Sequence, residues 1–314
     1  MRGVRSATAV ITVLALPACS ALPRTDTVDS LTRQSVTPQG ATAVVAHYNA
    51  VAAGADRRLA ADPIAGVQTG DLLRQTQAAY KIGRLLKKPF ERASTFTVDS
   101  VGAPEYGGYP MRFVASGNQR VGVWERASAG AAWRLSYSVP PSAGASLPEL
   151  TGVREVAPSS ALELAESPAG AAAKLAELLT VGTKSANARL FAPTPELTKL
   201  LKNLADSHAV DPSGLILAVT DTFTVNSAPV AFRTTNGEVL AFATLTDENV
   251  MRPRFGAMWP VGQNTAAFST PNHLYRNALT TTSVHQFALA IPMRKDARIR
   301  VLGFTTQLVD AGGY

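Results

Sequence analysis

The side chains that most often bind metal ions or activate water are sparse in this sequence. Its four histidines lie far apart along the chain, at His47, His208, His273 and His285. Metal sites combine His, Cys and carboxylates at short, fixed spacings, and no His-Glu-x-x-His or Asp-x-Asp pattern occurs here. The sequence therefore predicts no metal site.

Motifs for nucleophilic catalysis and for nucleotide binding are missing as well. The chain has neither a Gly-x-Ser-x-Gly elbow nor a Ser-x-x-Lys pair. It also lacks the glycine-rich loop followed by lysine that cradles phosphate groups. We therefore expect no cofactor and none of the common hydrolase mechanisms.

One histidine and four aromatic residues are candidates for lining a ligand pocket. His285 shares one face of a predicted strand with apolar residues, which could aim its ring into a cavity. Tyr48 and Tyr80 lie on predicted helical stripes, and Trp133 and Tyr137 on the apolar face of a predicted sheet. The alternative is that the aromatic residues form the hydrophobic core and that His285 lies at its edge, bonded to backbone.

Trp124 is a candidate for contacting a partner protein. It lies on the opposite strand face from Val121 and Val123, together with Arg120 and Arg126. An exposed tryptophan between two arginines is typical of binding surfaces. Packing of Trp124 against another domain would explain the same pattern.

The single cysteine, Cys19, follows a predicted export signal at 1–18, so no disulfide can form within the chain. The signal begins with two arginines and continues with an apolar stretch too short to span a bilayer. Leu16-Pro17-Ala18-Cys19 resembles the bacterial lipobox, although a small or hydroxylated residue is commoner at the position of Pro17. The resemblance implies a lipoprotein, with Cys19 anchored by acyl chains at the outer face of the cytoplasmic membrane. A secreted protein with an incidental cysteine is the alternative.

The rest of the chain is long enough for two domains with separate cores. Residues 19–38 are polar and predict a flexible tether. A linker rich in proline and small residues, 141–149, separates an N-terminal domain at 39–140 from a C-terminal domain at 150–314. Each domain is predicted to be α+β, with helices followed by a curved antiparallel sheet.

Two changes of hydrophobic period support this organisation. In the first domain, helical spacing over 40–58 and after Asp71 gives way at Ser94 to alternation, which indicates a sheet with one buried face. In the second, Ser167-Pro168 and Thr194-Pro195 each predict the start of a helix. Strand patterns follow at 214–225, 229–234, 238–246, 284–292 and 298–308, with a tight hairpin at Asn236-Gly237.

Spaced residues along most of 40–310 are similar to an uncharacterised family of actinobacterial envelope lipoproteins. They include Tyr48-Asn49, Thr69-Gly70, Val123-Trp124-Glu125-Arg126, Trp133-Arg134-Leu135 and Arg300-Val301-Leu302-Gly303. The resemblance implies an envelope lipoprotein and assigns no activity. The order of helices and sheet is also similar to cone-shaped folds of the nuclear-transport-factor-two-like kind.

Two functional hypotheses follow. The first is a non-enzymatic binding or interaction module, held at the membrane by its N-terminal lipid, whose partner could be a cell-wall component or an envelope protein. The second is an enzyme with a motif-less acid–base site in a cone-shaped cavity. A formal charge of +7 without a dense basic run argues against nucleic acid as a partner.

Overall fold

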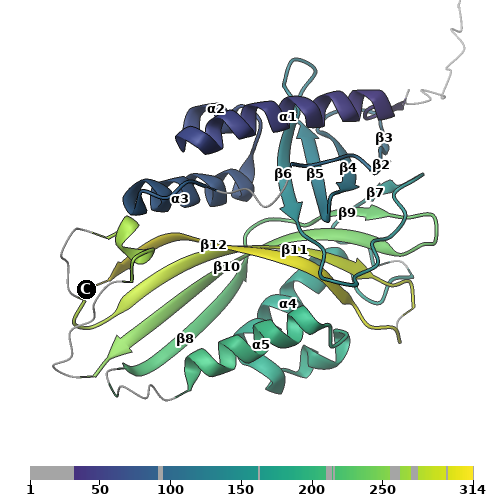
Figure 1. Ribbon diagram of the computed structural model, residues 1–314. Coiled ribbons are helices and arrows are strands. Elements are labelled where there is room, and N and C mark those ends of the chain that lie inside the picture. The colour runs from purple at the N-terminus through teal and green to yellow at the C-terminus, as the bar shows by residue number, and fades with distance from the viewer. Residues whose placement is uncertain are drawn as a thin grey trace, which may run out of the picture. The chain divides into compact units, whose positions relative to one another are not determined.

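The computed structural model contains helices and two larger antiparallel sheets, of four and six strands (Figure 1). This confirms the expected α+β class with curved antiparallel sheets. The structure describes residues 32–90, 95–161, 163–209, 214, 216–254, 262–269, 275–294 and 296–313. The expected signal peptide, Cys19 and most of the expected tether lie outside the described residues.

The N-terminal half of the described chain forms the four-stranded sheet, in the order β2-β4-β5-β6. Its helices are α1 (Pro38–Arg58), α2 (Ala61–Ala65) and α3 (Gly70–Leu86). Its strands are β1 (Arg33–Gln34), β2 (Ser100–Gly102), β3 (Glu105–Tyr106), β4 (Met111–Gly117), β5 (Arg120–Arg126) and β6 (Arg134–Val139). Because β1 pairs with β3, the chain becomes regular at Arg33, several residues before the expected end of the tether.

The C-terminal half forms the six-stranded sheet, in the order β12-β11-β10-β9-β7 with β8 also paired to β10. Its strands are β7 (Arg154–Val156), β8 (Ile216–Val225), β9 (Val230–Arg233), β10 (Val239–Pro253), β11 (Leu279–Ile291) and β12 (Arg300–Gly313). Its helical segments are α4 (Pro168–Val181), η1 (Gly182–Lys184), η2 (Ala186–Leu190), α5 (Pro195–His208) and η3 (Thr265–Ala267).

Side-chain caps fix the starts of the two long helices in this half. The Ser167 hydroxyl accepts a hydrogen bond from the Gly170 N–H at 3.0 Å, and Thr194 caps α5 through the N–H of Leu197. Each cap is followed by proline, which lacks the N–H that the first helical turn leaves unpaired. The predicted starts of both helices are confirmed.

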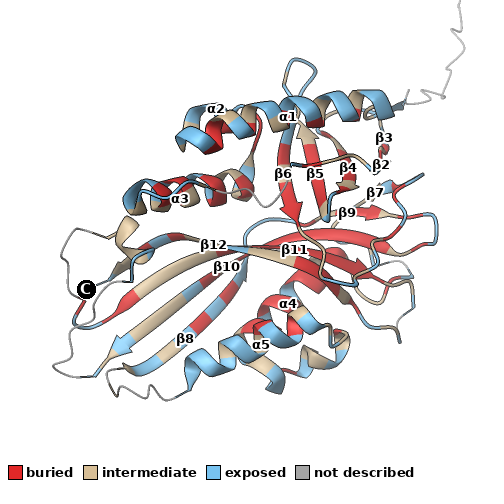
Figure 2. Cartoon of the chain, viewed as in Figure 1, coloured by how far each residue is buried: buried red, intermediate tan, exposed pale blue. Residues whose placement is uncertain are grey.

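The described elements stack in layers, with α1 and α2 over the small sheet, the small sheet over the large one, and α4 and α5 on the far face (Figure 1). Helix α3 packs against β6 of the small sheet and against β12 and β11 of the large sheet. Three larger apolar cores lie between these layers, and a small fourth one, of Ala78, Val284 and Val309, joins α3 to the large sheet. Buried residues gather along these cores in Figure 2. The middle core joins the two sheets, through residues such as Val123 and Tyr137 on one side and Phe242 on the other. Apolar side chains of α1, α4 and α5 thus pack directly against the sheets.

The expectation that the first sheet has one buried face is wrong. Val121 and Val123 face the large sheet, while Trp124 and Leu135 belong to the core under α1. A register shift after Val123 lets Trp124 pair with Leu135, so that β6 places Leu135 and Tyr137 in different cores. Both faces are covered because one packs against the helices and the other packs against the large sheet. The sequence had predicted that one of these faces would be exposed to solvent.

A buried glutamine ties the two sheets together through the backbone of β6. Gln286 donates from Nε2 to the Ser136 carbonyl at 2.9 Å, and its Oε1 accepts from the Ser138 N–H at 3.3 Å. Thr32–Tyr314 forms one compact unit, so the division into independently folding domains stays a prediction. Within the described residues, no helix has both the length and the apolar character needed to cross a bilayer.

Candidate functional site

The predicted pocket residues of the N-terminal half lie in or beside the core under α1. Tyr48 and Tyr80 are buried there, and Trp133 packs against the same core. The Tyr48 hydroxyl accepts a hydrogen bond from Gln68 at 3.2 Å, and the Tyr80 hydroxyl donates to Asp56 at 2.5 Å. Their packing fits the alternative that these aromatic residues are core residues with satisfied polar ends.

Tyr137 and Trp124 occupy two different cores. Tyr137 lies between the sheets with its ring centroid 5.6 Å from that of Phe242, and burial raises the pKa of its hydroxyl. Trp124 is fully buried, stacked on Phe113 with ring centroids 5.0 Å apart. The prediction of an exposed Trp124 that contacts a partner is thus wrong, because α1 and its neighbours cover that face of the sheet.

His285 lies on β11, on the face of the large sheet that α4 and α5 cover. Its ring stacks on Phe287 at 6.1 Å and contacts Phe223 at 5.2 Å between centroids. Its Nδ1 lies 2.8 Å from the Thr306 hydroxyl, and its Nε2 lies 3.8 Å from Asp247 Oδ2. His285 is thus enclosed with a carboxylate beside it, and its bond is to a side chain of β12 rather than to backbone.

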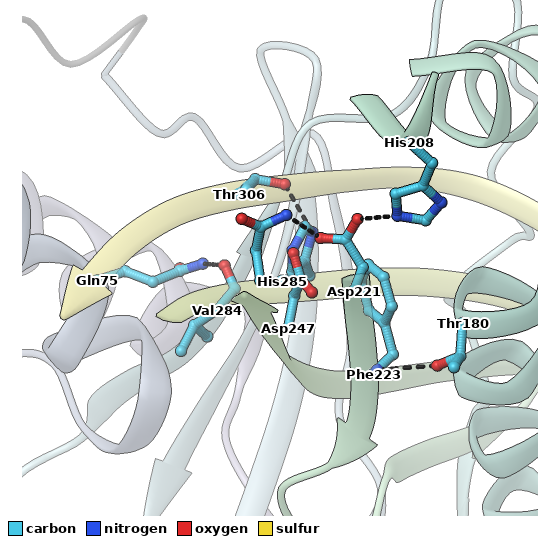
Figure 3. A network of polar contacts seen from close by, with 10 residues as sticks. Gln75, Thr180, His208, Asp221, Phe223, Asp247, Val284, His285 and Thr306 are labelled. Atoms are coloured by element: carbon cyan, nitrogen blue, oxygen red, sulfur yellow. Dashed lines mark hydrogen bonds and ion pairs between the residues drawn. The ribbon is translucent and has the colours of Figure 1, made fainter. Parts of the chain in front are cut away.

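A second acid, Asp221 on β8, joins this group, as Figure 3 shows. Its Oδ2 lies 2.5 Å from His208 Nε2, at the last turn of α5, and its Oδ1 accepts from Asn249 at 2.8 Å. Burial raises the pKa of Asp247; the adjacent His285 lowers it, the adjacent Asp221 raises it, and burial prevails. We call His208, Asp221, Asp247 and His285 the Asp221 cluster.

The Asp221 cluster is closed rather than open. The exposed fractions of its side chains are 3% for Asp221, 11% for Asp247 and 5% for His285, and only His208 reaches 34%. In the described part of the chain, no group of three or more His, Cys, Asp or Glu side chains is arranged to hold a metal ion. The cluster links the end of α5 to the sheet, and its two acids are almost fully enclosed.

Sequence reasoning found His285 and missed the two acids. Asp221 stands two residues before the buried Phe223, and Asp247 two residues after the buried Leu245. Each carboxylate therefore occupies an inward position of an alternating strand. A charged residue in the apolar phase of a strand is the signal that could have revealed them.

An open polar groove of 1310 Å³ lies elsewhere, beside the short strands β1 and β3. Its walls come from the start of α1, from β2, from β3 and from the segment that leads into β7. The lining residues are Thr32, Gln34, Pro38, Thr42, Val98, Asp99, Ser100, Val101, Ala103, Glu105, Tyr106, Gly107, Thr151, Gly152, Val153, Arg154 and Glu155. None of the predicted pocket residues lines it.

Two edge strands meet at this groove. Strand β2 ends the four-stranded sheet and β7 ends the six-stranded sheet, and both contribute lining residues. Sequence reasoning placed neither β3 nor β7, because strands of two or three residues are too short to show alternation. The groove therefore depends on the packing of the two sheets, which places their edge strands β2 and β7 next to each other.

Fixed charges support one wall of the groove. Arg112 holds Glu155 Oε1 at 2.7 Å through Nη1 and Glu125 Oε2 at 2.7 Å through Nε. The Tyr106 hydroxyl is buried next to Glu155, and burial together with this carboxylate raises the pKa of Tyr106 far above the ordinary value. Tyr106 is thus a neutral phenol, and Glu155 is a carboxylate held in place before any ligand arrives.

These features define a layered α+β protein with a closed acid–histidine cluster and an open polar groove. The chain belongs to the family described as a domain of unknown function, DUF8094, whose model matches residues 32–313. No curated protein and no solved structure matches the chain.

Proposed function

We propose that the protein is a lipid-anchored extracytoplasmic lipoprotein that acts as a non-enzymatic binding module. The groove is the observation that carries this proposal. It is open, wide and lined by hydrogen-bonding side chains, whereas the only described acid–histidine group is enclosed beneath α5. Chemistry needs its acid and base within reach of a substrate, and binding needs only the open surface.

The location of the protein rests on the lipobox-like sequence that ends at Cys19 and on the resemblance to actinobacterial envelope lipoproteins. Two acyl chains hold a protein at a membrane far better than one. The groove lining begins at Thr32, within thirteen residues of Cys19, so a ligand in the groove would lie near the membrane surface. A wall component or an envelope protein is accessible there.

The anchoring is tested by Cys19→Ser. We expect the substituted protein to remain unprocessed or to appear in the medium, because membrane retention depends on the acyl chains. Fractionation of cells that express either form measures this. An unchanged share of the substituted protein in the membrane pellet would refute the lipid anchor.

The binding role is tested with a matched pair of adjacent glycines. A side chain at Gly107, which lines the groove, or at Gly108, which does not, would meet no atom within 4 Å of its Cβ. Gly107→Trp should therefore obstruct the part of the groove beside β3 without disturbing the fold, and Gly108→Trp is the control. We expect the purified full chain in detergent to co-sediment with isolated cell-wall or envelope material, and Gly107→Trp alone to abolish this. Equal co-sedimentation of all three proteins would overturn the assignment of the groove.

A further inference from the structure

The groove is larger and more open than a typical cavity for a small molecule. Cavities for drug-sized ligands measure about 300–1,000 Å³ and enclose most of the ligand. This groove measures 1310 Å³ and extends from the start of α1 across β2 and β3 to β7. An elongated ligand would fit such an open channel.

The charges that line the groove disfavour a polyanion. Three carboxylates line it, from Asp99, Glu105 and Glu155, against a single cation, Arg154. Phosphate-rich polymers and anionic headgroups would therefore meet a surface of their own sign, in contrast to the positive charge of the whole chain.

A ligand rich in hydroxyl groups matches this lining. Each hydroxyl both donates and accepts hydrogen bonds. The carboxylates would accept from it, and the Arg154 guanidinium, which makes no hydrogen bond or ion pair within the described residues, would donate to it. Glu155 is already oriented by Arg112 at 2.7 Å, so less ordering would accompany binding.

A bound peptide is the competing occupant, because exposed strand edges can pair with an extended chain. The two edges at the groove are Ser100–Gly102 and Arg154–Val156, each only three residues long. Such short edges offer few backbone hydrogen bonds, and short edge strands are one way in which proteins avoid strand addition. Most contacts between the groove and a ligand would therefore come from side chains rather than from backbone hydrogen bonds.

We propose that the groove binds a neutral glycan chain, contacted by the carboxylates of Asp99, Glu105 and Glu155 and by Arg154. This inference rests on the proposed function, since it names the ligand class of the same groove. The glycan would lie along the channel with its hydroxyl groups toward Glu155 and Arg154.

The test is a titration of the full chain in detergent with neutral hexasaccharides of glucose, N-acetylglucosamine, galactose or arabinose. Hexalysine and polyphosphate serve as charged comparisons. We expect at least one hexasaccharide to bind with a Kd below about 1 mM and neither charged polymer to compete. Arg154→Gln and Gly107→Trp should each weaken binding at least about tenfold, while Arg134→Gln and Gly108→Trp should not.

Binding of hexalysine alone, or of no probe at all, would overturn the glycan assignment. If isolated wall material still co-sedimented in a manner sensitive to Gly107→Trp, the proposed binding function would survive and only the ligand class would fall. The melting temperature of each variant checks independently that it is folded. All four variants should keep the melting temperature of the parent protein.

Discussion

In the Asp221 cluster, acids and histidines are packed beneath a helix, whereas the charged residues of the groove meet water on one side. Asp221 and Asp247 are almost fully enclosed, and each needs a partner inside the protein. Glu155 and Arg112 keep exposed side-chain fractions of 26% and 20%. The cluster is thus expected to govern stability, and the groove is expected to govern binding with little cost to stability when it is changed.

The largest effect is expected for Asp221→Ala. The substitution removes the acceptor shared by His208 and Asn249 and leaves their donors without it. We expect a loss of about 1–3 kcal/mol in the free energy of unfolding. Urea unfolding at pH 7 measures it, with the exposed Asp206→Ala on the same helix as His208 as a control. A loss no larger than that of the control would remove the stabilising role of the cluster.

A change in the pH dependence of stability is expected for Asp247→Asn. The folded-state pKa of Asp247 is raised, so between the unfolded and folded pKa values the native state binds more protons than the unfolded state. Its contribution to stability is present in acid and is lost as the pH rises through the folded pKa. Asp247→Asn should therefore flatten this decline and raise stability at neutral pH relative to acid pH. Unfolding measured at a series of pH values from acid to neutral checks this. An unchanged slope would contradict it.

A smaller effect is expected in the groove, for Glu155→Gln. The ion pair with Arg112 is partly exposed, and Arg112 keeps its second partner, Glu125. We expect a loss of at most about 1 kcal/mol, because water screens such pairs. The same urea titration measures it. A loss as large as that of Asp221→Ala would show that the groove wall is a structural element as well, and the contrast between the two regions would fail.

The smallest effect on stability is expected for Arg154→Gln. Arg154 is exposed and makes no hydrogen bond or ion pair within the described residues. Substitutions at such positions usually stay within about 0.5 kcal/mol. Calorimetric melting of the purified protein checks this, and a clear drop in melting temperature would mean that Arg154 supports the fold rather than a ligand.

Local signals were sufficient for the long elements and insufficient for the short ones. The caps Ser167 and Thr194 with their prolines marked α4 and α5, and alternation marked most of the long strands, because these depend on neighbours in sequence. The hairpin at Asn236-Gly237 also forms, with Gly237 at a φ of 85°. The two- and three-residue strands that shape the groove have no such local signal.

The site residues divide in the same way. His285 could be singled out because its strand face is apolar, yet Asp247 beside it comes from β10, Asp221 from β8 and His208 from α5. The four aromatic candidates for the pocket had only their hydrophobicity in common. In the structure, Tyr48, Tyr80 and Trp133 pack in or beside the core under α1, and Tyr137 packs in the core between the sheets. Trp124 was only a candidate for the surface, because alternation shows that a residue changes face and does not show what covers that face.

The α+β class, the starts of the capped helices and the lipobox-like segment at Cys19 could be predicted, since each depends on residues that are neighbours along the chain. Long-range packing brings two sheets face to face, buries Trp124 and gathers four distant residues into the Asp221 cluster. It also decided where β2 and β7 would leave an open groove. Burial depends on which apolar face of one element packs against which face of another. The alternating pattern of a strand is compatible with several such packings, so it does not select one.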